Sequence, residues 1–248
     1  MKRDTFLPNA TLDEKVDYYF STFKKSGKSY TRNDIKRAIE HLSYKIVDPM
    51  PKTESATNPS MYIFRHGQTE DNADFTFSGW RDSPLTQKGR DQALNLSEKL
   101  QDKNINMLIS SPQIRAVETL KLALSKNKQA QKLEIVTDPR IQERSYGDLQ
   151  GKSKLEFYLD NPKELENIRR SFTYKVTNGE SIAEVCSRVA DFLDEIVPMI
   201  KQTGINVAIS CHGNSIRGFR RYFEHLSDIE TATLETPLAQ DYLAYEIR

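Results

Sequence analysis

Hydrophobic and polar positions follow a helical period near the start of the chain. Apolar side chains recur every three or four residues in two stretches, which Gly27 and Ser29 separate. They are Val16, Tyr19, Phe20 and Phe23, and then Ile35, Ile39, Leu42 and Ile46. Residues 1–47 are therefore predicted to form a helical extension, with Thr31 or Asn33 capping the second helix. Prolines and hydroxyl side chains over residues 48–60 predict a linker.

Short apolar runs alternate with amphipathic stretches over residues 61–248, which are expected to form the main domain. The runs that predict strands are 61–64, 107–109, 133–136, 207–210 and 242–247. Helix starts are expected at Thr86, at Ser111 followed by Pro112, at the capping box Ser181–Glu184, and at Asn214 or Ser215. The alternation predicts an α/β fold with a doubly wound, mostly parallel sheet flanked by helices.

Composition narrows the class of protein. The 248 residues include 36 Lys and Arg against 35 Asp and Glu, so no basic field favours nucleic acid or an anionic membrane as a partner. Cys186 and Cys211 lack CxxC spacing and lie on apolar faces, which predicts buried thiols in a reducing compartment. No apolar run reaches the ~20 residues of a membrane span. The first residues lack the apolar core of a signal peptide, so we expect a cytoplasmic protein.

Two of the four histidines follow predicted strands. His66 and His212 are each followed by glycine, at the strand ends where open α/β sheets bind ligands. A neutral imidazole can act as a nucleophile, and Arg65 and Arg115 could hold an anion beside it. Taken one at a time, a loop histidine and a solvated arginine are the simpler interpretations. Glu143 could serve as general acid and base if it lies near this site.

Several ordered motifs carry a family resemblance. They are Arg65-His66-Gly67-Gln68-Thr69, Ser78-Gly79-Trp80, Pro84-Leu85-Thr86, Ser110-Ser111-Pro112 with Arg115, Glu143-Arg144-Ser145-Tyr146-Gly147, Arg169-Arg170, Gly179-Glu180-Ser181 and His212-Gly213-Asn214-Ser215-Ile216-Arg217. Over about residues 61–247 the chain resembles the histidine phosphatase superfamily, and within it the cofactor-dependent phosphoglycerate mutases. The resemblance makes residues 61–248 the catalytic domain.

The resemblance also implies roles for individual residues. His66 would become phosphorylated, Arg65, Arg115 and His212 would hold the phosphoryl group, and Glu143 would move protons. Substrate would be bound by Asn72, Ser78, Gly79, Tyr146, Lys154, Arg169, Arg170 and Asn214. No metal and no permanently bound cofactor is expected. The implied substrate is a small phosphorylated molecule, with 2,3-bisphosphoglycerate as the phosphoryl primer of a mutase.

Three functions stay open at this point. A mutase would interconvert 3-phosphoglycerate and 2-phosphoglycerate, a phosphatase would hydrolyse small phosphomonoesters, and a silent site would leave a binding module. The loop 173–178 and the end of the sequence at Arg248 depart from many mutases, and residues 79–86 are also similar to broad-specificity phosphatases. The N-terminal helices are expected to pack on the catalytic domain or on a second subunit, as in a homodimer, with a small partner-binding unit as the alternative.

Overall fold

A five-stranded sheet forms the centre of the computed structural model, which describes residues 10–43 and 49–248. The strand order is β3-β2-β4-β1-β5. The strands are β1 (Ser60–Arg65), β2 (Met107–Ser110), β3 (Ile135–Thr137), β4 (Val207–Cys211) and β5 (Leu243–Glu246). All neighbouring strands are parallel except β5, which runs antiparallel to β1. The predicted mostly parallel α/β sheet is confirmed.

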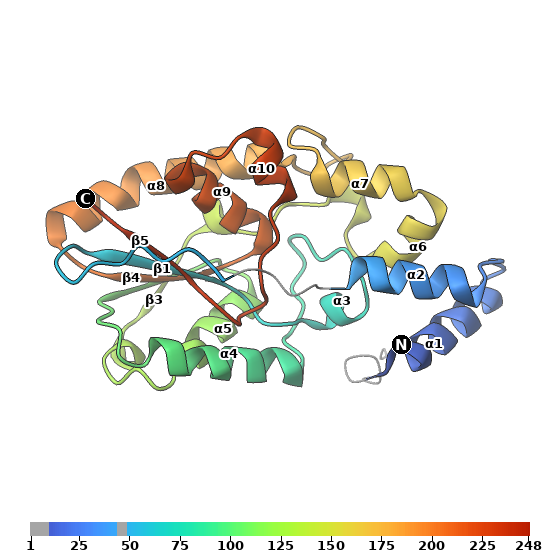
Figure 1. The fold of residues 1–248 in the computed structure, drawn as a ribbon, viewed down its shortest axis with the longest axis horizontal. Coiled ribbons are helices and arrows are strands. Elements are labelled where there is room, and N and C mark those ends of the chain that lie inside the picture. Colours follow the sequence, from blue (N-terminus) through green and yellow to red (C-terminus); the bar gives the residue numbers. More distant parts are fainter. Residues whose placement is uncertain (1–9, 44–48) are drawn as a thin grey trace.

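Helices cover both faces of this sheet (Figure 1). Side chains such as Ile63 and Ile209 pack on one face against α8 (Ile182–Thr203) and α9 (Gly213–Glu224). Side chains such as Phe64 and Leu108 pack on the other face against α4 (Gln87–Leu100) and α5 (Ile114–Ala123). Smaller helices lie in the connections: α3 (Glu70–Ala73), α6 (Lys154–Asp160), α7 (Pro162–Arg170), α10 (Asp228–Thr233), and the 3-10 helices η2 (Ala130–Lys132), η3 (Pro139–Ile141) and η4 (Gly147–Leu149). Because side chains alternate along each strand, the sheet supports two separate cores.

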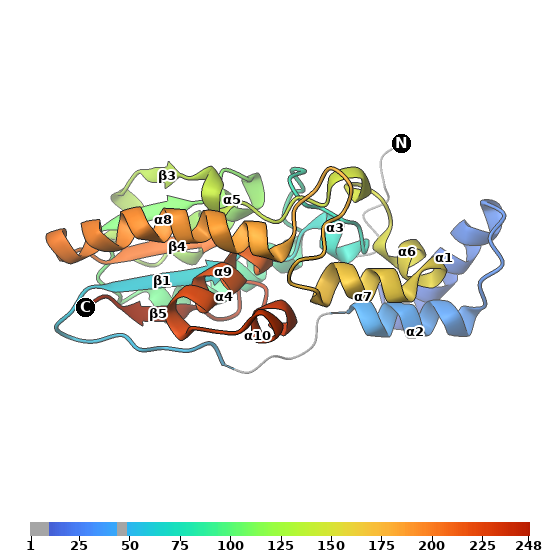
Figure 2. The ribbon, with the colours of Figure 1, turned by 90° about the horizontal axis from the view of Figure 1, so that it is seen from above.

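The N-terminal extension forms a helical hairpin, α1 (Leu12–Lys25) and α2 (Arg32–Leu42), at one end of the molecule beside α6 and α7 (Figure 2). Thr31 caps α2, and its side chain accepts from the Asp34 amide. The apolar stripe of the hairpin shares one buried cluster with Phe77 and with Ile168 of α7. The hairpin therefore packs on the catalytic domain, as one of the sequence-based alternatives expected. The predicted position of Ile46 on this stripe lies outside the described residues.

The stretch before β1 follows the edge strand β5. The Thr53 amide donates to Ala244 O at 2.8 Å, and the Ala244 amide donates to Pro51 O at 3.0 Å. This part of the predicted linker therefore extends the hydrogen bonding of the sheet edge. No helix in the described ranges is long and apolar enough to cross a membrane.

Two predicted helix caps are wrong. Helix α5 begins at Ile114, after the cap residue Gln113. The Ser111 hydroxyl accepts a long bond of 3.4 Å from the Gln113 amide and lies 2.8 Å from Nε2 of His212, at the neighbouring strand end. Helix α9 is capped by His212, and its first turn receives no side-chain cap from Asn214 or Ser215. The Ser111 hydroxyl and the side chains of Asn214 and Ser215 contact residues far away in the sequence, which local sequence patterns do not encode.

Candidate active site

His66 follows the last residue of β1 at the carboxyl edge of the sheet. Its Nδ1 lies 2.7 Å from Gly67 O, and a carbonyl only accepts, so Nδ1 carries the proton and Nε2 keeps the lone pair. The side chain is 2% exposed. Burial, with the charges of Arg115 and Arg65, lowers the pKa of His66 well below its usual value. The ring is therefore neutral at neutral pH, with its orientation fixed and a lone pair on Nε2.

The backbone around His66 is held by glycines in close contact. A Cβ on Gly67 would lie 2.2 Å from Gly89 O, and a Cβ on Gly89 would lie 2.0 Å from Gln68 O. The Gly67 amide donates to Thr119 Oγ1 at 3.1 Å. The start of α4 thus packs directly on the loop after His66 and fixes its position.

His212 lies beside His66, with ring centroids 5.0 Å apart. Its Nε2 is 2.8 Å from Ser111 Oγ, whereas its buried Nδ1 has no hydrogen-bond partner among the residues described. Burial, together with Arg115 and the neighbouring histidine, lowers the pKa of His212 well below its usual value. The second imidazole is thus also neutral at neutral pH.

Two buried arginines face these rings. Arg115, 1% exposed, donates to Arg81 O at 2.8 Å and to Gly79 O at 2.9 Å. Its buried Nε has no hydrogen-bond partner within the described part of the chain. Arg65 donates to Thr236 O at 2.9 Å. Buried cations held by neutral carbonyls favour an anion between them.

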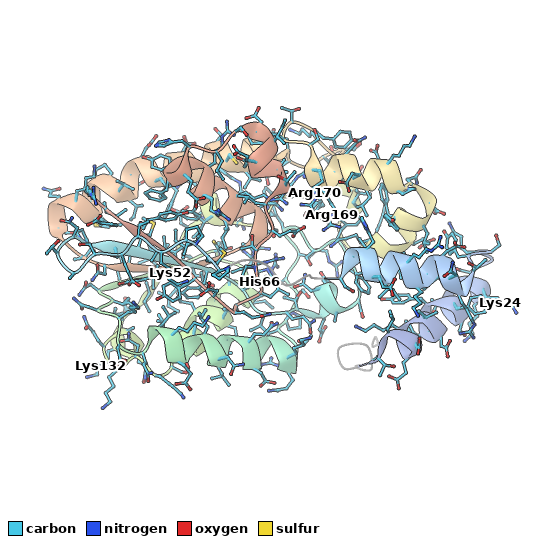
Figure 3. All side chains as sticks on the ribbon, viewed as in Figure 1. Lys24, Lys52, His66, Lys132, Arg169 and Arg170 are labelled. Carbon is cyan, nitrogen blue, oxygen red and sulfur yellow. The ribbon has the colours of Figure 1, made fainter. Side chains whose placement is uncertain are left out.

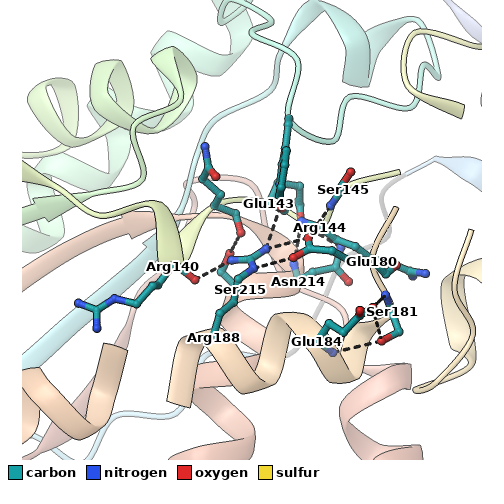
Figure 4. Close-up of polar contacts among 12 residues, drawn as sticks. Arg140, Glu143, Arg144, Ser145, Glu180, Ser181, Glu184, Arg188, Asn214 and Ser215 are labelled. Carbon is teal, nitrogen blue, oxygen red and sulfur yellow. Dashed lines mark hydrogen bonds and ion pairs between the residues drawn. The ribbon is translucent and has the colours of Figure 1, made fainter. Parts of the chain in front are cut away.

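Glu143 lies in the same pocket and is held by its Oε1 (Figure 4). This oxygen accepts from the Arg144 amide at 2.8 Å, and from the amide and side-chain nitrogens of Asn214 at 3.2 and 2.9 Å. Burial raises the pKa of Glu143, but the charge of Arg65 and these bonds outweigh it and hold the pKa below its usual value. The first turn of α9 therefore holds a carboxylate, as helix N-termini favour.

Most of the predicted site residues come together around one pocket. Its lining includes the predicted residues Arg65, His66, Asn72, Ser78, Gly79, Arg115, Glu143, Tyr146, Lys154, Arg169 and Asn214. Burial, with Arg169 and Arg65 nearby, lowers the pKa of Lys154 to about 8. His212 lies against His66 at the edge of this set. Arg170 does not line the pocket and instead bonds to Thr233 O and Glu235.

The family model of the histidine phosphatase superfamily (branch 1) matches residues 61–240. The chain belongs to this superfamily. It is 33% identical over 209 residues to phosphoglycerate mutase 1 of Saccharomyces cerevisiae, covering 72% of this chain and 83% of that protein. It is 33% identical over 178 residues to the 2,3-bisphosphoglycerate-dependent phosphoglycerate mutase of Cytophaga hutchinsonii, covering 71% and 83%. The family resemblance predicted from the motifs is confirmed.

Solved structures of this superfamily share the fold. YhfR of Bacillus stearothermophilus superimposes with a TM-score of 0.67 at 25% identity, covering 75% of this chain and 90% of that one. A mycobacterial glucosyl-3-phosphoglycerate phosphatase with VO3 superimposes with a TM-score of 0.66 at 24% identity, covering 75% and 92%. The region outside the family match includes the helical hairpin α1–α2.

Sequence reasoning missed several residues that line this pocket. Arg217 lines the pocket and donates to Asn214 Oδ1 at 3.1 Å, and burial lowers its pKa to about 10. It stands at the end of the His212 motif, so its place in that motif was the available signal. Leu42 and Glu235 also line the pocket, and no motif marks either one.

One group in the described chain could hold a metal ion. The candidate ligand atoms of His66, Glu143 and His212 all lie within 4.8 Å of one another. The positive charges of Arg65 and Arg115 help to lower the pKa values of the same two imidazoles. Their positive charges oppose a cation and favour a phosphoryl group at this place.

Proposed function

We propose that this member of the histidine phosphatase superfamily transfers phosphoryl groups through a phosphohistidine on His66. The observation that carries the proposal is the neutral imidazole, with Nδ1 bound to Gly67 O, beside the buried cations Arg65 and Arg115. Nε2 attacks phosphorus, the bond from phosphorus to the ester oxygen breaks, and the leaving oxygen takes a proton. The two guanidinium groups stabilise the charge on the transferring phosphoryl oxygens.

Glu143 is the proposed source of that proton. Its pKa is low in the free protein, so the carboxyl is ionised at neutral pH. A phosphate dianion entering beside it raises that pKa, because like charges disfavour each other. Substrate binding therefore favours the protonated acid just where the leaving oxygen needs a proton. The same carboxylate then accepts a proton from the group that attacks the phosphohistidine.

We propose mutase activity as the first function, with interconversion of 3-phosphoglycerate and 2-phosphoglycerate primed by 2,3-bisphosphoglycerate. Such a substrate carries a carboxylate as well as a phosphate. Lys154, Arg169 and Arg217 line the same pocket and offer cations for that second group. The similarity to proteins named phosphoglycerate mutase supports this choice.

Hydrolysis of small phosphomonoesters is the second candidate, and one contact favours it. The Glu235 carboxylate is paired with Arg169 and Arg170, two cations that a mutase would use for substrate. A pocket whose second cationic region is already partly balanced by a carboxylate would suit substrates with a single phosphate.

The test incubates the full chain with 3-phosphoglycerate and 2,3-bisphosphoglycerate, and measures both 2-phosphoglycerate and inorganic phosphate. Isomerisation that exceeds phosphate release supports the mutase, and phosphate release without isomerisation supports the phosphatase. Acid-labile, base-stable phosphate on the protein, lost in His66→Ala, supports the phosphohistidine and excludes a silent binding module. Full turnover by His66→Ala would overturn the proposal.

A further inference from the structure

Three arginines hold the segment 233–236 over the pocket by donating to its backbone carbonyls. Arg170 donates to Thr233 O at 3.3 Å, and Arg217 donates to Leu234 O at 2.9 Å. Arg65 donates to Thr236 O at 2.9 Å. Residues 234–236 also line the pocket. The segment is therefore positioned by cations of the same region that would receive an anionic ligand.

Glu235 is the acidic side chain of this segment. Its Oε1 is 3.6 Å from Arg169 Nη2 and also accepts from Arg170 Nη2. Figure 3 shows both arginines at the end of α7 that lies beside α10. Burial raises the pKa of Glu235, but the charges of Arg170, Arg169 and Arg217 outweigh it and hold the pKa low. The carboxylate is thus ionised and balances positive charge at the pocket wall.

The contacts of Glu235 differ from those of a carboxylate fixed in the scaffold. Glu180 accepts from the Ser145 amide at 2.7 Å and from Arg188 at 3.0 Å, with its side chain 16% exposed. The bonds of Glu235 are to arginine side chains, and its side chain is 37% exposed. A partly exposed ion pair costs less to exchange for another anion than a buried pair that is also bonded to the backbone. Glu235 can therefore be displaced from its arginines without unpairing buried backbone.

We propose that Glu235 is an internal counter-ion that occupies the Arg169–Arg170 subsite and weakens the binding of ligands with a second anionic group. The inference rests on the proposed function in one respect, namely that the pocket receives a phosphorylated ligand. A ligand with one phosphate binds at His66 and leaves Glu235 in place. A ligand with a second phosphate or a carboxylate must displace Glu235 or approach its negative charge.

Binding of two anions to the full chain tests this inference without any turnover. Isothermal titration would compare inorganic phosphate with 2,3-bisphosphoglycerate on the native chain and on Glu235→Gln. We expect Glu235→Gln to tighten 2,3-bisphosphoglycerate about tenfold, because one like charge is removed a few ångströms from the second phosphate. Inorganic phosphate should change by less than about threefold, since the charge of Glu235 acts on it from a greater distance.

Two further variants separate local from general charge effects. Glu235→Asp keeps the charge and should bind both anions within about threefold of the native chain. Glu118→Gln removes a carboxylate of similar exposure that pairs with Arg90 at 2.7 Å, and it should change neither affinity. Equal tightening of both anions by Glu235→Gln, or no tightening of 2,3-bisphosphoglycerate, would overturn the inference. So would failure of inorganic phosphate to bind the native chain, or failure of 2,3-bisphosphoglycerate to bind Glu235→Gln.

These outcomes are distinct from failure of the proposed function. A chain that binds both anions but forms no phosphohistidine would refute the proposed transfer and still decide the role of Glu235. A chain that isomerises phosphoglycerate with no change in binding on Glu235→Gln would refute the counter-ion alone.

Discussion

Replacing Glu143 by Gln tests its role as the acid that protonates the leaving oxygen. Glutamine keeps the shape of the side chain, and its amide oxygen can keep the three donors that now converge on Oε1. What it loses is the transferable proton. We therefore expect the variant to fold as the native chain does and to fail in the chemical step.

The expected loss of rate depends on how Glu143 obtains its proton. That pKa lies below its ordinary 4.5, so at pH 7 fewer than roughly one free molecule in three hundred carries the proton. The bound phosphate must therefore raise this pKa before Glu143 can act as an acid. General acid–base catalysis contributes about 10²–10⁴ in rate, so Glu143→Gln should slow transfer from 3-phosphoglycerate by about that factor. The barrier would rise by about 3–5 kcal/mol.

The assay is single-turnover formation of the phosphohistidine from two donors. 3-Phosphoglycerate releases glycerate, whose alkoxide oxygen needs a proton, whereas p-nitrophenyl phosphate releases a stabilised phenolate that does not. Glu143→Gln should therefore slow the second donor by less than about tenfold. Equal losses on both donors would refute the acid role and point to a change in pocket geometry. Glu118→Gln, at an ion pair away from the pocket, should slow neither.

Three other predictions concern the stability of the fold and the position of the loop after His66. The pKa values of buried His66 and His212 are lowered, so only the unfolded chain takes up these protons below about pH 6.5. Urea unfolding should thus show stability falling as pH drops below 6.5, by about 1.4 kcal/mol per unit for each histidine, and a flat profile would contradict this. Ile39→Ala, at a 2% exposed site shared by hairpin and domain, should cost about 2–5 kcal/mol in the same measurement. Gly89→Ala places a Cβ 2.0 Å from Gln68 O and should slow phosphoryl transfer about 10²-fold by shifting the loop, and a native rate would show that the loop tolerates it.

Local patterns predict the parts of this fold whose causes are local. The capping box of α8 and the cap of α4 at Thr86 lie where the sequence places them, and α2 is capped by Thr31, one of its two predicted caps. Each of these side chains bonds within three residues. The strands before His66 and His212 are apolar runs buried on both faces, as parallel strands require. The shared edge of these strands then brings both histidines together.

Contacts over long sequence separations could not be predicted in this way. Ser111 has the position of a cap, but its hydroxyl meets His212, 101 residues later. Arg65 binds the carbonyl of Thr236, 171 residues away, and nothing in the sequence near either residue marks that bond. Glu235 was missed for the same reason, because its role depends on two arginines of α7. The family motifs could identify the histidines, arginines and glutamate of the site, but not the contacts that join them to distant segments.

The hairpin α1–α2 ends at Leu42, whose side chain is part of the pocket wall. The rest of the hairpin packs in a cluster with Phe77 and Ile168, which line the same pocket. A ligand in the pocket can contact Leu42 only while the hairpin is docked on the catalytic domain. Docking therefore favours ligand binding, and ligand binding favours docking by the same free energy. A molecule that binds the docked hairpin more tightly than the undocked hairpin would thereby raise the affinity of the site without entering it. Docking of the N-terminal hairpin and ligand binding in the catalytic domain are thus thermodynamically coupled.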